Sequence, residues 1–248
     1  MKKTMNYESI PGIDLFMNLK EKPMDRNFAI KHSREYVHVT FDHPHHVLSS
    51  AVLNGGFVEA NHIINLKVPK TPPHSDAPDP PAVFIQKHCR LEGLFGCCVG
   101  MMTAASMNSL QTTNRCGRGI EITVIVTAGL SNLRRAGDKA DHYEQVELHP
   151  APGTINTIVL SNISLTRAGM VEAVMIATEA KAAALQNLAL VSPVSNTVAT
   201  GTGTDAIAIA CTQSGKKITY AGKHTHFGEL LAKSVIESTT TSAMYAGH

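Results

Sequence analysis

Four segments that join a predicted buried strand to a cluster of glycine, serine, threonine and asparagine are where this sequence could do chemistry. Glycine permits positive φ angles and close backbone approach to a ligand, and small hydroxyl and amide side chains supply directional hydrogen bonds. Turns and caps favour the same residues, but four such segments in one chain favour a polar site lined by backbone. They are SSAVLNGG (Ser49–Gly56), TAGLSNLRRAGD (Thr127–Asp138), PGTIN (Pro152–Asn156) and ATGTGTD (Ala199–Asp205).

The segment YAGKHTHFGEL (Tyr220–Leu230) places Lys223 and His224 in a loop just before the last predicted helix. Histidine is the usual general base near neutral pH, although a single loop histidine is more often only solvated. His224 is the stronger candidate because Lys223 stands beside it. This loop therefore supplies one candidate base and one candidate cation.

A second lysine, Lys181, falls on the side of a predicted helix that carries Met170, Val174 and Ala177. Each residue advances an α-helix by about 100°, so Glu179 points roughly 200° away from Lys181 and the two cannot pair directly. A lysine at an apolar edge can act as a base or bind an anionic group. More often its ammonium extends to solvent.

Metal and thiol chemistry have weaker support. His43, His45 and His46 could bind a metal ion or cobalt, but spacing alone is weak support and no H-E-x-x-H motif is present. The five cysteines include no C-x-x-C pair, and Cys97 and Cys98 stand in an apolar stretch. We expect no metal site of the protein's own, and small buried thiols in a reducing compartment.

Composition disfavours several classes of protein. The 248 residues are 43% hydrophobic and 17% charged with a net charge of +2, which argues against disorder and against nucleic-acid binding. No apolar segment follows MKKTMNYES, and no run of about 18 apolar residues occurs. We expect a cytoplasmic protein without a membrane span. ATGTGTD lacks the phosphate-loop pattern, and no G-x-S-x-G elbow is present.

Strands must bring the four glycine-rich segments together. Runs with rough alternation predict early strands at Ile13–Leu19, Phe28–His32 and Val37–Phe41, with breaks at Gly12, Pro23 and 42–44, and a further strand at 62–68. β-Branched runs predict buried strands at Glu121–Thr127, Thr154–Leu160 and Ala206–Cys211. The proline-rich stretch Pro69–Pro81 predicts a surface loop, with Pro81 as the first residue of a helix Ala82–Leu91.

Two longer helices complete the expected fold. The first spans Thr166–Leu188, with Ser164 or Thr166 as its N-cap. Its predicted apolar face is Val171, Val174, Met175, Thr178, Ala182 and Leu185. The second buries Phe227, Leu230, Leu231, Ser234 and Val235 and carries a Glu229–Lys233 pair, and residues 239–248 are expected to fray. The order of elements predicts one layered domain over 1–248, α+β or α/β, with a mixed β-sheet packed by helices.

Eight segments, in order, resemble the adenosylcobinamide amidohydrolase family. They run from about residue 48 to 235, and eight segments in family order are not readily produced by chance. Residues 1–47 and the stretch 69–81 carry little that matches. The segments are LSSAVLNGG (48–56), INLKV (64–68), VGMMTAA (99–105), TAGLSNLRRAGD (127–138), PGTINTIVL (152–160), LTRAGMVEAVMIATEAKAAAL (165–185), ATGTGTDAIAIA (199–210) and YAGKHTHFGEL (220–230).

The resemblance implies a corrinoid small molecule as partner and a reaction in corrinoid salvage for cobalamin synthesis. The amide that joins the corrin-ring propionate to aminopropanol in adenosylcobinamide would be hydrolysed to adenosylcobyric acid and 1-amino-2-propanol. No cofactor is implied, because the cobalt belongs to the substrate. A homo-oligomer is compatible with the sequence.

Amide hydrolysis needs an activated nucleophile, an oxyanion stabiliser and an acid for the leaving amine. His224 or Asp205 could activate water, Lys223 could hold the substrate amide or the developing charge, and Thr154 is a candidate nucleophile if the reaction is covalent. Direct attack by water is favoured. Glycine N–H groups of the binding segments could stabilise the oxyanion, and their asparagine amides suit the amide side chains of a corrin. The binding candidates are Ser49, Ser50, Asn54, Gly55, Gly56, Asn132, Asn156, Glu179, Lys181, Thr200, Gly201, Thr202, Gly203 and Thr204.

Two alternatives remain at this point. A non-catalytic corrinoid-binding or carrier protein would use the same cleft without releasing aminopropanol. A different amidase or N-acyl transferase could process itself between Gly153 and Thr154.

Overall fold

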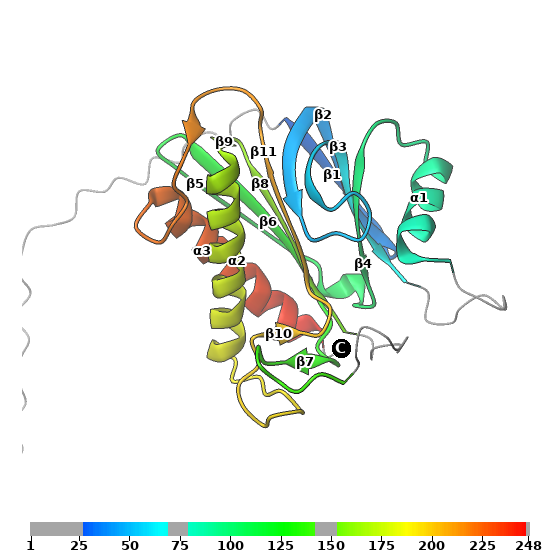
Figure 1. Cartoon of the computed structure of the whole chain (residues 1–248), viewed down its shortest axis with the longest axis vertical. Coiled ribbons are helices and arrows are strands. Elements are labelled where there is room, and N and C mark those ends of the chain that lie inside the picture. Colours follow the sequence, from blue (N-terminus) through cyan, green and yellow to red (C-terminus); the bar gives the residue numbers. More distant parts are fainter. Residues whose placement is uncertain (1–26, 69–78, 142–152, 247–248) are drawn as a thin grey trace, which may run out of the picture.

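The computed structural model describes residues 27–68, 79–141 and 153–246 (Figure 1). These residues form one eight-stranded mixed sheet with three α-helices packed on it. The strand order is β4-β3-β2-β11-β8-β6-β5, and β1 adds to β2. The predicted α+β fold is therefore confirmed, whereas the predicted strand Ile13–Leu19 lies outside the described residues.

The bounds of the elements agree with most of the predicted ones. The large sheet contains β1 (Phe28–His32), β2 (Tyr36–Ser49), β3 (Gly56–Lys67), β4 (Cys98–Thr103), β5 (Gln111–Gly117), β6 (Ile120–Ala128), β8 (Ile155–Ser161) and β11 (Ala206–Cys211). Short strands β7 (Leu133–Arg134) and β10 (Gly201–Thr202) pair with each other, as do β9 (Ser164–Leu165) and β12 (Lys217–Ile218). The helices are α1 (Pro81–Leu91), α2 (Arg167–Asn187) and α3 (His226–Tyr245), with one 3₁₀ turn at Met107–Ser109.

Local chemistry sets where the helices begin. Pro81 stands in the first turn of α1, where its missing N–H costs no hydrogen bond. The hydroxyl of Thr166 accepts a hydrogen bond from the backbone N–H of Gly169 (3.0 Å) and caps α2, and Thr225 caps α3 in the same way through Gly228 (2.9 Å). Of the two N-cap candidates for α2, Thr166 is the one used.

Three predictions of local structure were wrong. β2 runs through the expected break at 42–44, because a register shift between Thr40 and His45 absorbs the irregularity. The end of the chain does not fray from residue 239, since α3 continues to Tyr245 and the hydroxyl of Ser242 donates to the backbone carbonyl of Ser109 (2.6 Å).

The third error concerns the apolar face of α2. Val171 and Met175 are more than half exposed and Thr178 is also exposed, although all three were expected to be buried. The buried stripe consists mostly of small residues: Gly169, Met170, Ala173, Ile176, Ala177, Ala180, Ala184 and Leu185. Small residues let the helix approach the sheet and α3 closely. This close approach, and not the size of the apolar side chains, determines which face of α2 is buried.

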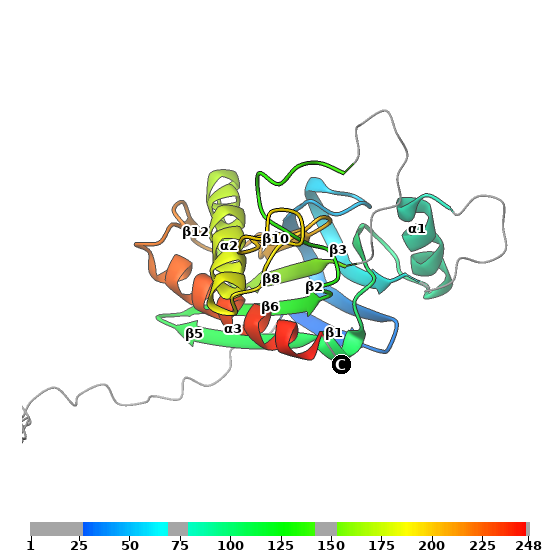
Figure 2. The ribbon, with the colours of Figure 1, turned by 90° about the horizontal axis from the view of Figure 1, so that it is seen from below.

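The sheet divides the core into layers. On one face, alternate residues of β6, β8 and β11 pack under α2 and α3. On the other face, apolar side chains of β2, β3, β4, β6, β8 and β11 pack against one another. α1 covers the outer part of β3 and β4, away from α2 and α3 (Figure 2).

The sheet curls until non-adjacent strands meet on its inner face. The side-chain amide of Asn65 on β3 donates to the hydroxyl of Thr127 on β6 (2.8 Å), although β2, β11 and β8 separate these strands in the sheet order. β8 and β11 are parallel and β6 is antiparallel to β8, so the ends at Ala128, Ile155 and Ala206 lie together. The glycine-rich segments after β6 and before β8 and β11 consequently converge at one end of the sheet.

None of the helices in the described part of the chain is long and apolar enough to cross a membrane.

Candidate active site

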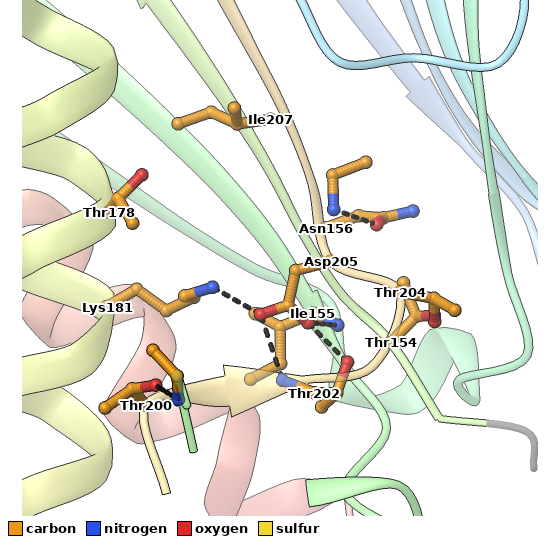
Figure 3. Close-up of polar contacts among 12 residues, drawn as sticks. Thr154, Ile155, Asn156, Thr178, Lys181, Thr200, Thr202, Thr204, Asp205 and Ile207 are labelled. Carbon is orange, nitrogen blue, oxygen red and sulfur yellow. Dashed lines mark hydrogen bonds and ion pairs between the residues drawn. The ribbon is translucent and has the colours of Figure 1, made fainter. Parts of the chain in front are cut away.

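Asp205, the residue just before β11, lies at the centre of a polar cluster at this end of the sheet (Figure 3). Its Oδ1 accepts hydrogen bonds from the backbone N–H of Ile155 (3.0 Å) and from the hydroxyl of Thr202. Its Oδ2 accepts from the backbone N–H of Thr202 (3.1 Å) and pairs with Nζ of Lys181. Four donors from three segments thus hold one carboxylate in a fixed orientation.

Lys181 extends from α2 toward this carboxylate, as Figure 3 shows. The side chains of Lys181 and Asp205 are only 14% and 15% exposed, so their attraction is screened less than that of a surface pair. Asp205 accepts one of the three N–H donors of the ammonium, and the other two can serve a ligand. The predicted anion-binding lysine therefore binds an anionic group of the protein itself.

Gly201 makes room for this ion pair. A Cβ atom at this position would lie 2.4 Å from Oδ2 of Asp205 and 2.9 Å from Nζ of Lys181. Both contacts are shorter than real Cβ atoms show, so any side chain at position 201 would displace the charged groups. Part of the glycine content of ATGTGTD is thus explained by the Lys181–Asp205 pair.

Two further hydroxyls lie beside the carboxylate. Those of Thr154 and Thr204 share a hydrogen bond, and the Thr204 hydroxyl also contacts the backbone carbonyl of Gly153 (3.0 Å). Thr202, in contrast, donates to a carboxylate, and Lys181 orients that carboxylate. A hydroxyl, a base and a group that orients the base form the pattern of an activated nucleophile. Sequence analysis had assigned Thr202 to substrate binding only.

A pocket opens onto the ion pair between α2 and the ends of β8 and β11. Its volume is about 220 Å³. It is lined by Ser50, Ile155, Thr157, Ala177, Thr178, Lys181, Asp205, Ala206 and Ile207. The lining therefore combines the ion pair and three hydroxyl side chains with four apolar residues, and a few polar groups among apolar walls are usual in a ligand site.

Comparison with known proteins finds a matching family and several relatives of this chain. The profile of the family described as adenosylcobinamide amidohydrolase matches residues 21–246. The chain is 34% identical over 197 residues to the adenosylcobinamide amidohydrolase of Methanosarcina mazei. The aligned region covers 76% of this chain and 85% of that protein. It is 32% identical over 129 residues to the protein of the same name from Halobacterium salinarum, covering 52% of this chain and 51% of that protein. The chain belongs to the adenosylcobinamide amidohydrolase family. The resemblance seen in the sequence is confirmed.

A relative without an assigned activity matches as well. An uncharacterised protein of Methanocaldococcus jannaschii is 34% identical over 152 residues, which is 56% of this chain and 59% of that protein. Family membership identifies the chain as a hydrolase that acts on an amide bond, with a role in corrinoid salvage.

The structure separates the predicted catalytic residues into two groups. Thr154 and Asp205 lie in the polar cluster, together with the binding candidates Lys181, Thr202 and Thr204. Lys223 instead pairs with Glu179, and His224 is exposed in the loop before α3. Because Glu179 and Lys181 point about 200° apart on α2, this second group lies on the opposite side of the helix from Asp205.

Several binding candidates serve the backbone near the site. The carbonyl of Asn132 accepts from the N–H of Gly203 (3.1 Å), and a Cβ at Gly203 would lie 2.6 Å from Nδ2 of Asn132. The hydroxyl of Thr200 accepts from the N–H of Ala136 (2.8 Å). These contacts, with the β7–β10 pairing, join the segment after β6 to the segment before β11.

Asn156 is engaged on the inner face of the sheet. Its Nδ2 donates to Oδ1 of Asn65 (2.8 Å) and to the carbonyl of Met102 (2.7 Å), and its Oδ1 accepts from the N–H of Ala206 (3.2 Å). This amide therefore holds the starts of β8 and β11 in register beside Asp205. Residue type alone does not distinguish such a positioning contact from a substrate contact.

The segment Ser49–Gly56 divides between turn and pocket. The hydroxyl of Ser49 donates to the carbonyl of Ile207 (2.8 Å), and Nδ2 of Asn54 donates to the carbonyl of Cys98 (2.8 Å). A Cβ at Gly55 would lie 2.3 Å from the carbonyl oxygen of Ala51, and Gly56 has a φ of 86°. Ser50 lines the pocket, so within this segment it is the candidate that reaches the ion-pair site.

The histidine cluster of the sequence does not form a shared site. His45 is buried and stacks on Phe41 with ring centroids 4.1 Å apart, while His46 approaches Glu59 (3.7 Å). Neighbouring residues of a strand point to opposite faces, which separates the two side chains. Burial lowers the pKa of His45. Within the described ranges, no three His, Cys, Asp or Glu side chains gather as metal ligands would.

Proposed function

We propose that this protein hydrolyses, at the Lys181–Asp205 site, the amide between the corrin propionate and aminopropanol in adenosylcobinamide. Water adds to the amide carbonyl carbon, the C–N bond breaks, and the products are adenosylcobyric acid and 1-amino-2-propanol. Family membership supports the amide-hydrolase chemistry. The observation that carries the assignment to this site is the shielded ion pair at the end of a pocket, with four donors on one carboxylate.

Lys181 is proposed as the group that stabilises the oxyanion. Its ammonium lines the pocket and retains two donors, and Asp205 fixes its position before the substrate arrives. A donor fixed in advance toward the developing negative charge lowers the barrier because no reorganisation is needed during the reaction.

Asp205 is proposed as the base that receives the proton of the nucleophile and then gives it to the leaving amine nitrogen as the C–N bond breaks. In the described structure both of its oxygens accept two hydrogen bonds, so one donor must withdraw for a proton to be accepted. The Thr202 hydroxyl is the donor that can withdraw by rotation, whereas the backbone N–H groups cannot. When that hydroxyl rotates away, water can take its place on Oδ1. Direct attack by water therefore stays our preferred mechanism, with the Thr202 hydroxyl as the candidate for a covalent one.

The proposed scheme uses no metal or cofactor of the protein, and the cobalt enters with the substrate. We also propose that the enzyme works in the cytoplasm, which the free thiols of Cys89, Cys97, Cys98, Cys116 and Cys211 support. Self-association stays a prediction that light scattering of the purified protein would test.

The decisive experiment is incubation of the purified protein with adenosylcobinamide, followed by mass spectrometry for adenosylcobyric acid. We expect turnover in the wild type and a loss of about 10²-fold or more in Asp205→Asn. Glu179→Gln is the matched control, because it makes the same chemical change on the opposite side of α2. Binding without any turnover in the wild type would instead support a corrinoid carrier. Loss of turnover in His224→Ala with full turnover in Asp205→Asn would move the reaction to the other side of the helix.

A further inference from the structure

The outward side of α2 carries apolar side chains beside the catalytic lysine. Val171 is 52% exposed and Met175 is 55% exposed. At 100° per residue, Val171, Val174 and Thr178 lie within about 80° of Lys181 around the helix. Met175, one turn after Val171, forms the outer edge of this surface, about 120° from Lys181. Val174 and Val171 stand two and nearly three turns before Lys181, about 10 and 15 Å along the axis. An apolar strip thus leads away from the ion pair along the helix.

The facing surface of the sheet continues this strip. Ile207 lines the pocket. Ile207, Leu48 and Phe57 are all partly buried and pack against the core under α2 and α3. Leu48 on β2 is the partner of Ile209 on β11, two residues after Ile207, so Leu48 and Ile207 lie on the same face of the sheet. Phe57 is the β3 partner of Leu48. The apolar surface is therefore continuous from the pocket across β2 to β3.

Arg167, in the first turn of α2, closes the far end. Its guanidinium carbon lies 4.5 Å from the centroid of the Phe57 ring. A cation stacked on an aromatic ring is held in place while its N–H donors stay available at the ring edge. The strip is thereby bounded by a fixed cation at one end and by the Lys181–Asp205 pair at the other.

The pocket is too small for the whole substrate. Its volume of about 220 Å³ holds the scissile amide and the aminopropanol group, whereas ligand sites that enclose a drug-sized molecule measure roughly 300–1,000 Å³. A corrin macrocycle with its side chains exceeds a drug-sized molecule. If the amide reacts at Asp205, the macrocycle must lie outside the pocket, against the surface that adjoins it.

We infer that the strip formed by Val171, Val174 and Met175 of α2 with Leu48, Phe57 and Ile207 of the sheet docks the corrin macrocycle of the substrate. This inference rests on the proposed function. The ring and its methyl groups cover the apolar floor, and Arg167 donates to carbonyl oxygens of the amide side chains on the rim. Exposed apolar side chains along a substrate path gain free energy when a ligand removes them from water.

The test is the double variant Val171→Ser/Met175→Ser, with Met244→Ser as the matched control. Met244 is a similarly exposed methionine on α3 (59%) and lies outside the strip. Steady-state turnover of adenosylcobinamide is measured together with its binding to the same variants in an Asp205→Asn background, by the change in corrin absorbance. We expect KM and Kd to rise about tenfold in the double variant, with kcat near wild type and no change in the control.

A small amide, N-(2-hydroxypropyl)propanamide, separates this inference from the proposed function, because it carries the scissile bond without the macrocycle. Its turnover should be equal in the wild type and in the double variant. Unchanged KM and Kd for adenosylcobinamide would overturn the docking inference while leaving the proposed reaction intact. A lower oligomeric mass of the double variant with unchanged Kd would also overturn it and would make the strip an interface between copies. Weaker corrinoid binding in the double variant, without turnover by any form, would support the docking surface and refute the reaction.

Discussion

Two lysine–carboxylate pairs lie on opposite sides of α2. The side chains of Lys181 and Asp205 are 14% and 15% exposed, and the carboxylate accepts three further hydrogen bonds. The side chains of Lys223 and Glu179 are 67% and 51% exposed. Water and salt screen the exposed pair, so it contributes little, whereas the shielded pair is fixed in place and faces a pocket. The same two functional groups thus acquire different roles from their surroundings alone.

The largest difference between the pairs should be in stability. We expect Lys181→Met to lower the free energy of unfolding by about 3–5 kcal/mol, because it leaves a shielded carboxylate without its cation. Lys223→Met should cost no more than about 1 kcal/mol. Urea denaturation of both variants measures this. Equal effects would show that the site around Asp205 is as open to solvent as the surface pair.

Catalysis should separate the same two lysines. Lys181→Met should reduce kcat for adenosylcobinamide by about 10²–10³-fold, the usual effect of losing one oxyanion donor. Lys223→Met should keep kcat near the wild-type value. Steady-state kinetics at saturating substrate makes the comparison. A larger loss in Lys223→Met would favour the loop of His224 as the reacting site.

Two glycines sharpen the contrast. Gly201→Ala should destabilise the protein by about 1–3 kcal/mol, since its Cβ would meet both charges of the shielded pair. Gly222→Ala is the control next to Lys223, where a Cβ meets nothing within 4 Å. Thermal melts should show a lower melting temperature for Gly201→Ala and an unchanged one for Gly222→Ala. A neutral Gly201→Ala would mean that the two charged groups can move apart without cost.

Two threonines test the hydroxyl that contacts the carboxylate. Thr202→Val removes the hydroxyl that donates to Oδ1 of Asp205. It should lower the free energy of unfolding by about 1–2 kcal/mol and change the pH profile of kcat/KM. Thr200→Val removes an acceptor for the N–H of Ala136 and should leave that profile unchanged. The pH profiles of the two variants, measured side by side, decide whether Thr202 acts through Asp205.

The smallest expected effect lies away from both pairs and concerns acid sensitivity. Burial, together with the neighbouring His62 ring, whose Nδ1 lies 3.2 Å from Nε2 of His38, lowers the pKa of His38 to about 4. The unfolded chain binds the proton more tightly, so stability is full above about pH 6.5 and is lost as the pH falls toward 4. His38→Gln should flatten this part of the curve of melting temperature against pH. An unchanged slope would assign the acid loss to other groups.

Local sequence predicted the elements that depend on short-range chemistry. β-Branched runs gave β6, β8 and β11 to within about one residue, the threonine cap gave the start of α2, and Pro81 gave the start of α1. The apolar face of α2 was wrong because Val171 and Met175 outweighed the alanines in a size-based pattern. A stripe of small residues is what allows close packing against a sheet, and no pattern of hydropathy alone distinguishes it.

The site was predicted in part. Residues of all four glycine-rich segments lie in or next to the polar cluster and its pocket, and Asp205, Lys181, Thr154 and Thr202 were all among the candidates. Which of them share a site could not be derived, because Lys181 and Asp205 are 24 residues apart and meet only when α2 packs beside β11. His224 ranked as a base because a lysine stands next to it in the sequence, and sequence adjacency does not say which side of a helix a loop joins.

The sequence by itself determined the family, the three helices, the central strands and the residue types of the site, because these depend on local propensities and on an ordered set of motifs. Only the tertiary structure decided that one lysine–carboxylate pair is shielded and the other exposed, and that α2 buries its small residues while Val171 and Met175 stay exposed. Shielding is a property of all the chain segments around a charge, so it exists only after the sheet curls and the helices pack.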